Sequence, residues 1–226
     1  NMTFRKKAKQ LPQADIFIIL ESEHPSHIPE QSGYDGIWKG DNRHKGVGIY
    51  SRTSIKLHLH EGYNPKYKYI IPIQMTDPVK MIIFAVWAMN DRKDVRKRSI
   101  GQIYLALKQY ETLLHHLCIM AGDFDWNIQW DKNPDNPLYG DFRDVLNFLA
   151  KYNIKSLYHL TSNDSFGKET TSTFYMYRKQ SRAYHTDDLF ASQDLITLLQ
   201  SFKIGMYSRW SNWSDYMPIC AQFDIS

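Results

Sequence analysis

The sequence predicts an α/β protein: a four-layer sandwich in which two mixed β-sheets pack face to face with helices outside them. Three observations predict this class. Short apolar runs of strand length recur along the chain, two longer segments have helical periodicity, and the helical segments fall between groups of strands. The 226 residues contain no low-complexity tract, short repeat or Gly/Ser linker, so we expect one domain spanning residues 1–226.

The N-terminal half is predicted to consist mostly of strands. A short helix is expected at residues 3–11, with Thr3 as its cap and Pro12 as its stop. Continuous apolar runs predict buried strands, whereas apolar and polar residues that alternate predict a strand with one exposed face. On these criteria we expect strands at residues 15–20, 46–51, 55–59, 69–74 and 81–88.

The C-terminal half adds two amphipathic helices to the pattern. Apolar residues recur at helical spacing in residues 97–116 and again in residues 142–149. A short buried strand is expected between them, at residues 117–120. Further strand-like stretches occupy residues 172–178, 190–192, 202–207 and 218–223.

The composition limits the classes of function. A net charge of +4 and a pI near 8.9 permit a polyanionic partner without requiring one. An apolar fraction of 42% excludes disorder as the main state. Cys118 and Cys220 each lie in an apolar run, which favours reduced thiols and a cytoplasmic location over a disulfide. No apolar run approaches the roughly 20 residues that a membrane span needs.

Carboxylates lie at the ends of the predicted strands. Ligand sites in α/β proteins gather where strand ends open into loops, so acids repeated at such points are expected to converge on one cleft. Clustered carboxylates repel each other and need a cation, and hard oxygen ligands select Mg²⁺, Mn²⁺ or Ca²⁺. Taken singly, each acid is better explained as a cap or turn residue. Together they predict metal-assisted hydrolysis of a phosphate ester; they are Glu21, Asp123, Asp125, Asp187, Asp188 and Asp215.

Five motifs in order carry a family resemblance over nearly the whole chain. They are Asp15-Ile16-Phe17-Ile18-Ile19-Leu20-Glu21, Gly46-Val47-Gly48-Ile49-Tyr50-Ser51, Gly122-Asp123-Phe124-Asp125, His185-Thr186-Asp187 and Ser214-Asp215-Tyr216-Met217-Pro218, with Asn90 after the strand at 81–88 as a further match. No motif is specific by itself. In this order, each at a strand end, they resemble the endonuclease/exonuclease/phosphatase superfamily, which includes DNase I-like and exonuclease III-like proteins.

The resemblance implies a role for each matched residue. The implied metal ligands for Mg²⁺ (or Mn²⁺ or Ca²⁺) are Glu21, Asp123 and Asp215. Asp123 would also position the attacking water. The other implied roles are contact with the phosphate by Asn90 and Asp125, help with metal binding or leaving-group protonation by Asp187, and support of Tyr216 by Asp215.

Three functions are compatible with these motifs. The first is a divalent-metal-dependent phosphodiester hydrolase, namely a nuclease acting on DNA or RNA. The second is a phosphomonoesterase acting on an inositol phosphate or a lipid headgroup. The third is a non-catalytic module that binds nucleic acid or another partner and has kept the fold. The sequence makes no prediction of the oligomeric state.

Four departures from the family's pattern predict an altered and impaired site. The family's first strand is missing ahead of the helix at residues 3–11, so we expect residues before Asn1. Asp125 replaces an Asn, and an ionised carboxylate can only accept hydrogen bonds. Tyr216 replaces a His, and Asp188 replaces an aromatic residue. Either the site has been rebuilt for a second cation or it has lost activity.

Two further features suggest contact with a polyanion, and each has a plainer explanation. The basic run at residues 92–98 is expected to overhang the cleft, or else to be a solvated turn before a helix. Four tryptophans in predicted loops are expected either to pack in the core or to stack on bases; they are Trp126, Trp130, Trp210 and Trp213.

Overall fold

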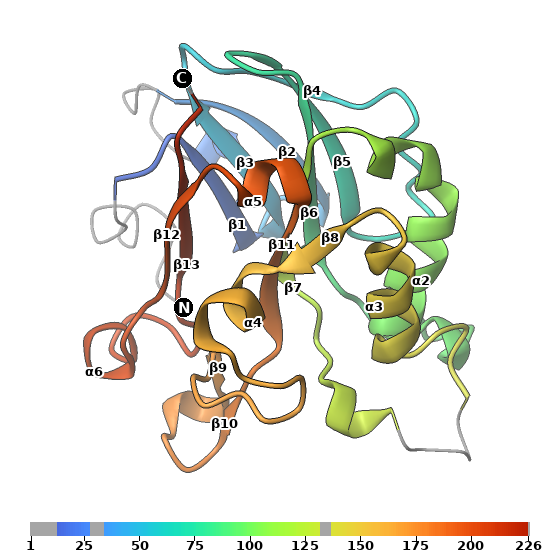
Figure 1. Cartoon of the computed structure of the whole chain (residues 1–226), viewed down its shortest axis with the longest axis vertical. Helices are drawn as coiled ribbons and strands as arrows, with labels where there is room; N and C mark the ends of the chain where they lie inside the picture. Colours follow the sequence, from blue (N-terminus) through green and yellow to red (C-terminus); the bar gives the residue numbers. More distant parts are fainter. Residues whose placement is uncertain (1–12, 28–33, 132–136, 226) are drawn as a thin grey trace.

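The computed structural model describes residues 13–27, 34–131 and 137–225. The helix predicted at residues 3–11 and the position of Asn1 lie outside the described residues. The predicted class is confirmed within them: the chain is a mixed α/β structure of packed sheets flanked by helices (Figure 1).

The larger sheet has six strands in the order β4-β5-β6-β7-β11-β8. β6 and β7 run parallel and the other neighbours run antiparallel, so the sheet is mixed. Its strands are β4 (Lys56–Leu59), β5 (Ile70–Asp77), β6 (Met81–Trp87), β7 (Cys118–Asp123), β8 (Ile154–Ser156) and β11 (Asp187–Ser192).

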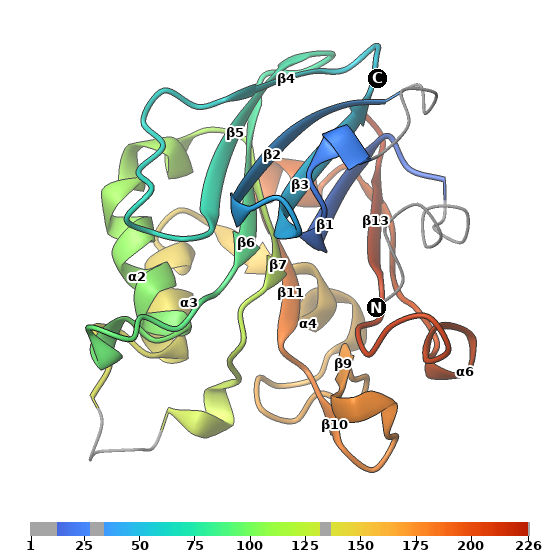
Figure 2. The same ribbon diagram turned by 180° about the vertical axis from the view of Figure 1, so that it is seen from behind.

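Two smaller sheets form the second layer, which lies in front in Figure 2. One has the order β1-β3-β2, and the other is the antiparallel pair β12 and β13. Their strands are β1 (Ile16–Ser22), β2 (Tyr34–Asn42), β3 (Lys45–Arg52), β12 (Leu199–Ile204) and β13 (Ile219–Phe223). The sequence did not predict β2, whose alternation is weakened by its glycines.

The core explains why β6 is apolar along its whole length. Side chains of a strand alternate between its two faces. Phe84 and Val86 lie in a buried cluster shared with the helices, whereas Ile83 and Ala85 lie in a second cluster shared with the smaller sheets. Both faces of β6 are therefore buried, as a strand inside a layered sandwich requires.

Two helices cover the outer face of the larger sheet (Figure 1). They are α2 (Ile100–Gln109) and α3 (Phe142–Ala150). α3 begins with a capping box in which Asp141 and Asp144 each accept from the other's backbone N–H. These helices bury the apolar stripes that the sequence predicted.

The helix expected at residues 97–116 is shorter than predicted. Short 3-10 turns, η2 (Val95–Lys97) and η3 (Glu111–His115), flank α2. Ser99 interrupts the segment because its φ of 42° is incompatible with a continuous right-handed helix. The periodicity was correct for the buried face, but it carried no signal for this break.

The predictions for the C-terminal segments also need correction. The strand expected at 172–178 shrinks to β9 (Phe174–Tyr175), because η5 (Met176–Arg178) follows with Tyr177 in the left-handed region. The strand expected at 202–207 ends at Ile204, and α6 (Tyr207–Trp210) follows. The remaining short elements are α4 (Leu157–Ser162), α5 (Gln193–Ile196), β10 (Ala183–Tyr184), η1 (Pro25–His27) and η4 (Ile128–Trp130).

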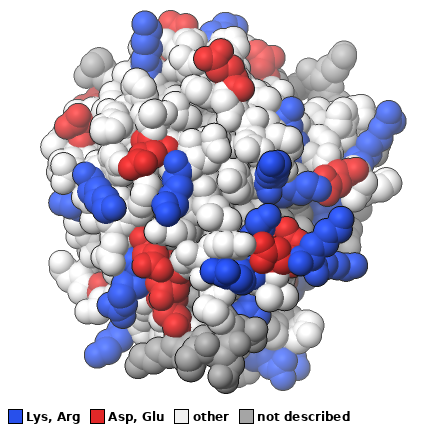
Figure 3. All heavy atoms as spheres, turned by 90° about the vertical axis from the view of Figure 1, so that its right-hand side faces the viewer, with Lys and Arg blue, Asp and Glu red and all other residues white. Residues whose placement is uncertain are grey.

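The surface and the thiols agree with the composition. On the face shown in Figure 3, Lys and Arg side chains are interspersed with Asp and Glu side chains, as a small net charge implies. Cys118 and Cys220 are both free, which confirms the expectation of reduced thiols. None of the helices in the described ranges is long and apolar enough to cross a membrane.

Gly122 is required where β7 approaches β6. Its φ is 140°, and a Cβ atom there would lie 1.9 Å from the carbonyl oxygen of Val86. We predict that Gly122→Ala lowers the free energy of unfolding by about 1–3 kcal/mol or more, measured by urea denaturation. Gly62→Ala, in an exposed turn, should change it by less than about 0.5 kcal/mol. Equal losses in the two variants would contradict this role for Gly122.

Candidate active site

The register of two neighbouring strands brings two acids together. Asp123 is the last residue of β7, Asp187 is the first residue of β11, and the two are directly paired across the antiparallel ladder. Paired residues on adjacent strands hold their Cβ atoms about 4.5–5.5 Å apart. Both residues are buried, so their carboxyl groups are poorly screened from each other.

Asp123 accepts hydrogen bonds on both carboxylate oxygens. The Asp125 N–H donates to Oδ1 at 2.7 Å, and the Tyr216 hydroxyl donates to Oδ2 at 3.1 Å. Burial, supported by the charges of Asp125 and Glu21, raises the pKa of Asp123 to about 7, although the two hydrogen bonds oppose the rise. Asp123 therefore titrates near neutral pH.

Asp187 is buried beside Asp123. The hydroxyl of Thr173 accepts from the backbone N–H of both Thr186 and Asp187, at 3.0 Å in each case. Burial raises the pKa of Asp187 well above its usual value, and the charge of Asp123 raises it further. Asp123 and Asp187 therefore form a buried pair of carboxyl groups whose pKa values are both raised, which is the arrangement that proton transfer requires.

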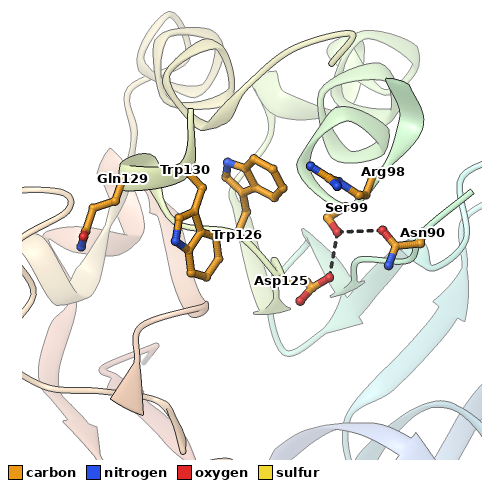
Figure 4. Close-up of a pocket in the computed structure, with 7 residues that line it drawn as sticks. All are labelled: Asn90, Arg98, Ser99, Asp125, Trp126, Gln129 and Trp130. Atoms are coloured by element: carbon orange, nitrogen blue, oxygen red, sulfur yellow. Dashed lines mark hydrogen bonds between the residues drawn. The ribbon is translucent and has the colours of Figure 1, made fainter. Parts of the chain in front are cut away.

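Asp125 faces away from Asp187 and toward the start of α2. The Ser99 hydroxyl lies 2.8 Å from Asp125 Oδ2 and 3.5 Å from Asn90 Oδ1, so it links these two predicted site residues (Figure 4). Burial raises the pKa of Asp125, while the Ser99 hydrogen bond and the Arg98 charge lower it. Asp125 and Asn90 thus share one wall of a pocket beside Asp123.

The backbone is strained around these residues. Glu21, Ser99 and Asp125 are three of the seven described non-glycine residues with positive φ, at 56°, 42° and 46°. Such conformations cost about 1–3 kcal/mol each, and they persist where surrounding contacts enforce them. Their presence on three separate segments of one site indicates a selected geometry.

Tyr216 reaches Asp123 from a different part of the chain. Its backbone forms a bridge with Phe174, and the two rings lie 4.5 Å apart between centroids. Burial, and then the Asp123 charge, raise the pKa of Tyr216 above its usual value. The phenol therefore keeps its proton and acts as a donor to Asp123.

Glu21 and Asp215 are less directly involved than the sequence predicted. Glu21 is exposed and forms an ion pair with Lys45 at 2.8 Å, although its charge is close enough to raise the pKa of Asp123. Asp215 contributes through its backbone, because its carbonyl accepts from the Tyr175 N–H at 2.7 Å. The support expected from Asp215 for Tyr216 thus comes from the backbone. The Asp215 carbonyl fixes this segment against Tyr175, and Phe174 forms the bridge with Tyr216.

The described side chains do not form a closed metal cage. Among the described residues, no group of three His, Cys, Asp or Glu side chains is arranged to hold a metal ion. Mg²⁺ typically takes one or two protein carboxylates and completes its shell with water and phosphate oxygens. Asp123 and Glu21, whose charge reaches Asp123, are the carboxylates that could fill those one or two positions.

Asp188 points away from the acidic pair, as strand alternation requires. The Ser156 hydroxyl donates to its Oδ1 at 2.8 Å. His159 Nδ1 lies 2.8 Å from the same hydroxyl oxygen, and its Nε2 lies 3.2 Å from Glu169. The extra acid expected in the cleft thus belongs to a buried network behind the strand, although its charge still contributes to the raised pKa of Asp187.

Three contributors were missed from the sequence. Thr173 and Lys45 have no local signal, because their partners are distant in the chain. Ser99 precedes α2, where a Ser normally caps the helix, but it makes no side-chain capping bond. Its hydroxyl is used for Asp125 instead. Only the structure shows that Ser99, although it stands at the start of a helix, does not cap it.

Comparison with known proteins identifies the fold. No family model and no curated protein sequence matches the chain. The 3′ phosphatase NExo from Neisseria, bound to a product DNA hairpin, matches with a TM-score of 0.69 at 17% identity, over 98% of this chain and 96% of that chain. An AP endonuclease from Archaeoglobus fulgidus matches with a TM-score of 0.65 at 17% identity, over 98% and 92%. The endonuclease domain of the retrotransposon TRAS1 matches with a TM-score of 0.64 at 13% identity, over 97% and 90%.

The chain has a DNase I-like fold. This confirms the fold that the five motifs implied. In the DNase I-like framework of this chain, the predicted residues Asp123, Asp125, Asp187, Tyr216 and Asn90 converge at one end of the larger sheet. Identities this low concern the fold, so the activity is argued from the site.

The raised pKa of Asp123 predicts how stability depends on pH without metal. Because this pKa is about 7 in the folded protein against 3.8 ordinarily, the folded state binds the proton more tightly, and stability falls as pH rises from about 4 to about 7. Asp123→Asn does not titrate. Its free energy of unfolding should therefore rise relative to wild type by up to about 4 kcal/mol across that window.

Urea denaturation in EDTA across this pH range measures the difference. As a control, Mg²⁺ added above about pH 7 should stabilise wild type more than Asp123→Asn, because only wild type gains a ligand for its buried charge. If the difference in free energy of unfolding between the two proteins stays constant with pH, the pKa of Asp123 is not raised in the folded state.

Proposed function

We propose that this protein is a divalent-metal-dependent phosphodiester hydrolase, a nuclease acting on DNA or RNA. The observation that carries the proposal is the buried pair Asp123 and Asp187, which are directly paired across β7 and β11 and whose pKa values are both raised. Such pairs are costly to bury and recur where proton transfer is needed. The structural neighbours, which include AP endonucleases and a DNA-bound 3′ phosphatase, support the same class of reaction.

Glu21 and Asp123 would hold the metal ion, with Asp215 as the third ligand that the motifs imply. A bound Mg²⁺ would offset the negative charge that develops on the phosphoryl oxygens. Glu21 would then exchange its ion pair with Lys45 for the metal, or share its carboxylate between them.

The two acids divide the proton transfers. Asp123 would position the attacking water and accept its proton. Asp187, whose pKa is raised by burial and by the Asp123 charge, would hold a proton that it can donate to the leaving oxygen. Tyr216 holds the Asp123 carboxylate in place by donating to Oδ2, and Asn90 lies where its amide can contact the phosphate.

The site is also proposed to be slow. An ionised Asp125 accepts hydrogen bonds and repels a phosphate, whereas an amide would donate. Tyr216 is neutral and cannot supply the positive charge of an imidazolium. Both replacements remove stabilisation from the phosphate, and one lost donor typically lowers a rate by about 100- to 1,000-fold.

The first activity test uses fluorescein-labelled single-stranded and duplex DNA and RNA with Mg²⁺. Wild type should cleave nucleic acid, and Asp123→Asn should lose at least about 100-fold in rate because the proton acceptor and metal ligand are gone. Asp224→Asn, an exposed acid after β13, is the matched control and should retain full activity.

The outcomes separate the three functions. Phosphate release from inositol phosphates without cleavage of nucleic acid would identify a phosphomonoesterase. Nucleic-acid binding that is unchanged by Mg²⁺, with no product in either assay, would identify a non-catalytic module. Both results would contradict the proposed nuclease.

A second test concerns the impaired site. The double variant Asp125→Asn, Tyr216→His should raise Mg²⁺-dependent hydrolysis by about 100- to 1,000-fold, because it restores an amide donor and an imidazole. Adding Asp123→Asn to this double variant should abolish the gain. An unchanged rate in the folded double variant would mean that these two side chains do not limit the reaction.

A further inference from the structure

A pocket beside the acidic pair extends beyond the phosphate contacts that are proposed for Asn90 and Asp125. It has a volume of about 560 Å³, which is within the usual range of small-ligand sites, about 300–1,000 Å³. Its floor and one wall come from Asp125, Ser99 and Asn90, and its opposite wall comes from Trp126 and Trp130 (Figure 4). The pocket is larger than a single phosphate group needs.

The tryptophan wall offers an aromatic face. Trp130 is 38% exposed, which is high for so large an apolar side chain. Trp126 packs edge-on against it at 5.9 Å and is itself anchored, because its Nε1–H donates to Asp131 at 2.8 Å. Trp130 is therefore held by Trp126 and by Tyr184, whose ring centre lies 6.0 Å away, while more than a third of its surface remains exposed for stacking.

Arg98 supplies a donor that lacks an acceptor. Its guanidinium lies 5.2 Å from the Trp126 ring centre, and its Nε is buried with no hydrogen-bond partner among the described residues. Arg98 also lines the pocket, so the accessible part of its guanidinium can receive a ligand oxygen there. A phosphate oxygen or a base carbonyl would fill that place.

Asp125 selects against a ligand made of phosphate alone. Its Oδ2 accepts from Ser99, and the carboxylate attracts donors such as the amino group of a base or a sugar hydroxyl. The complete set of an aromatic face, a cation and a carboxylate matches a nucleotide unit. An inositol phosphate or a lipid headgroup has no planar aromatic ring that could stack on Trp130, and neither has a base carbonyl.

We propose that this pocket binds one unstacked nucleotide next to the scissile phosphate, with its base on Trp130 and a flanking phosphate at Arg98. The proposal rests on the proposed function and narrows its substrate to nucleic acid with unpaired nucleotides. A base inside a duplex is stacked on both faces and cannot lie against Trp130 without being extruded. Single-stranded ends and overhangs present such a base at no extra cost.

The test is binding without catalysis, measured by fluorescence anisotropy in EDTA. The probes are a fluorescein-labelled duplex with a 3′ single-stranded overhang and the matched blunt duplex. Wild type should prefer the overhang. Trp130→Ala should weaken overhang binding by about 5- to 150-fold and leave blunt-duplex binding unchanged, whereas Trp130→Phe should keep most of the preference.

The control variant is His58→Ala, which removes an exposed aromatic ring from β4, at the far edge of the larger sheet. It should bind both probes as wild type does. If the wild type cleaves nothing, but prefers the overhang and this preference is lost in Trp130→Ala, the pocket assignment holds and the hydrolase proposal fails. If wild type cleaves nucleic acid but Trp130→Ala binds both probes like wild type, the pocket assignment is overturned and the hydrolase proposal stands.

Discussion

The antiparallel register of β7 and β11 forces the carboxyl groups of Asp123 and Asp187 together in the protein interior. Neither group can move away without breaking the ladder, and burial weakens the solvation that would otherwise offset their repulsion. The fold must therefore supply protons, donors or a cation at this point. The hydrogen bonds from Tyr216 and the Asp125 N–H stabilise part of the negative charge on Asp123, and a bound divalent ion would stabilise the rest.

The strained backbone at Ser99 and Asp125 connects this pair to its surroundings. The same φ of 42° that ends η2 before α2 turns the Ser99 hydroxyl toward Asp125 and away from the helix it would normally cap. Arg98 is thereby placed beside Trp126, on the wall of the pocket. One local distortion thus shapes both the acidic site and the adjoining pocket, which is why the two are expected to act on one substrate.

The unusual residues of the site are best understood together. Tyr216 keeps a donor on Asp123, Asp125 places an acceptor at the pocket, and Asp188 is directed behind the strand into a network with Ser156 and His159. The charge of Asp188 is therefore stabilised mostly by Ser156 and His159, on the side of the strand away from the cleft. The charge added at Asp125 is met by the Ser99 hydroxyl and the Arg98 charge at the wall of the pocket, where we propose that it alters what the site can bind.

The sequence by itself determined the α/β class, most strands and the acids at strand ends, because these depend on local periodicity and on motif order. It did not reveal β2, the break at Ser99, or the roles of Thr173 and Lys45, whose partners are distant in the chain. The sequence could not show that Asp188 faces away from Asp187, since that depends on which elements pack against each face of β11. Only the tertiary structure settled which acids meet, because strand register and the burial it imposes come from long-range pairing.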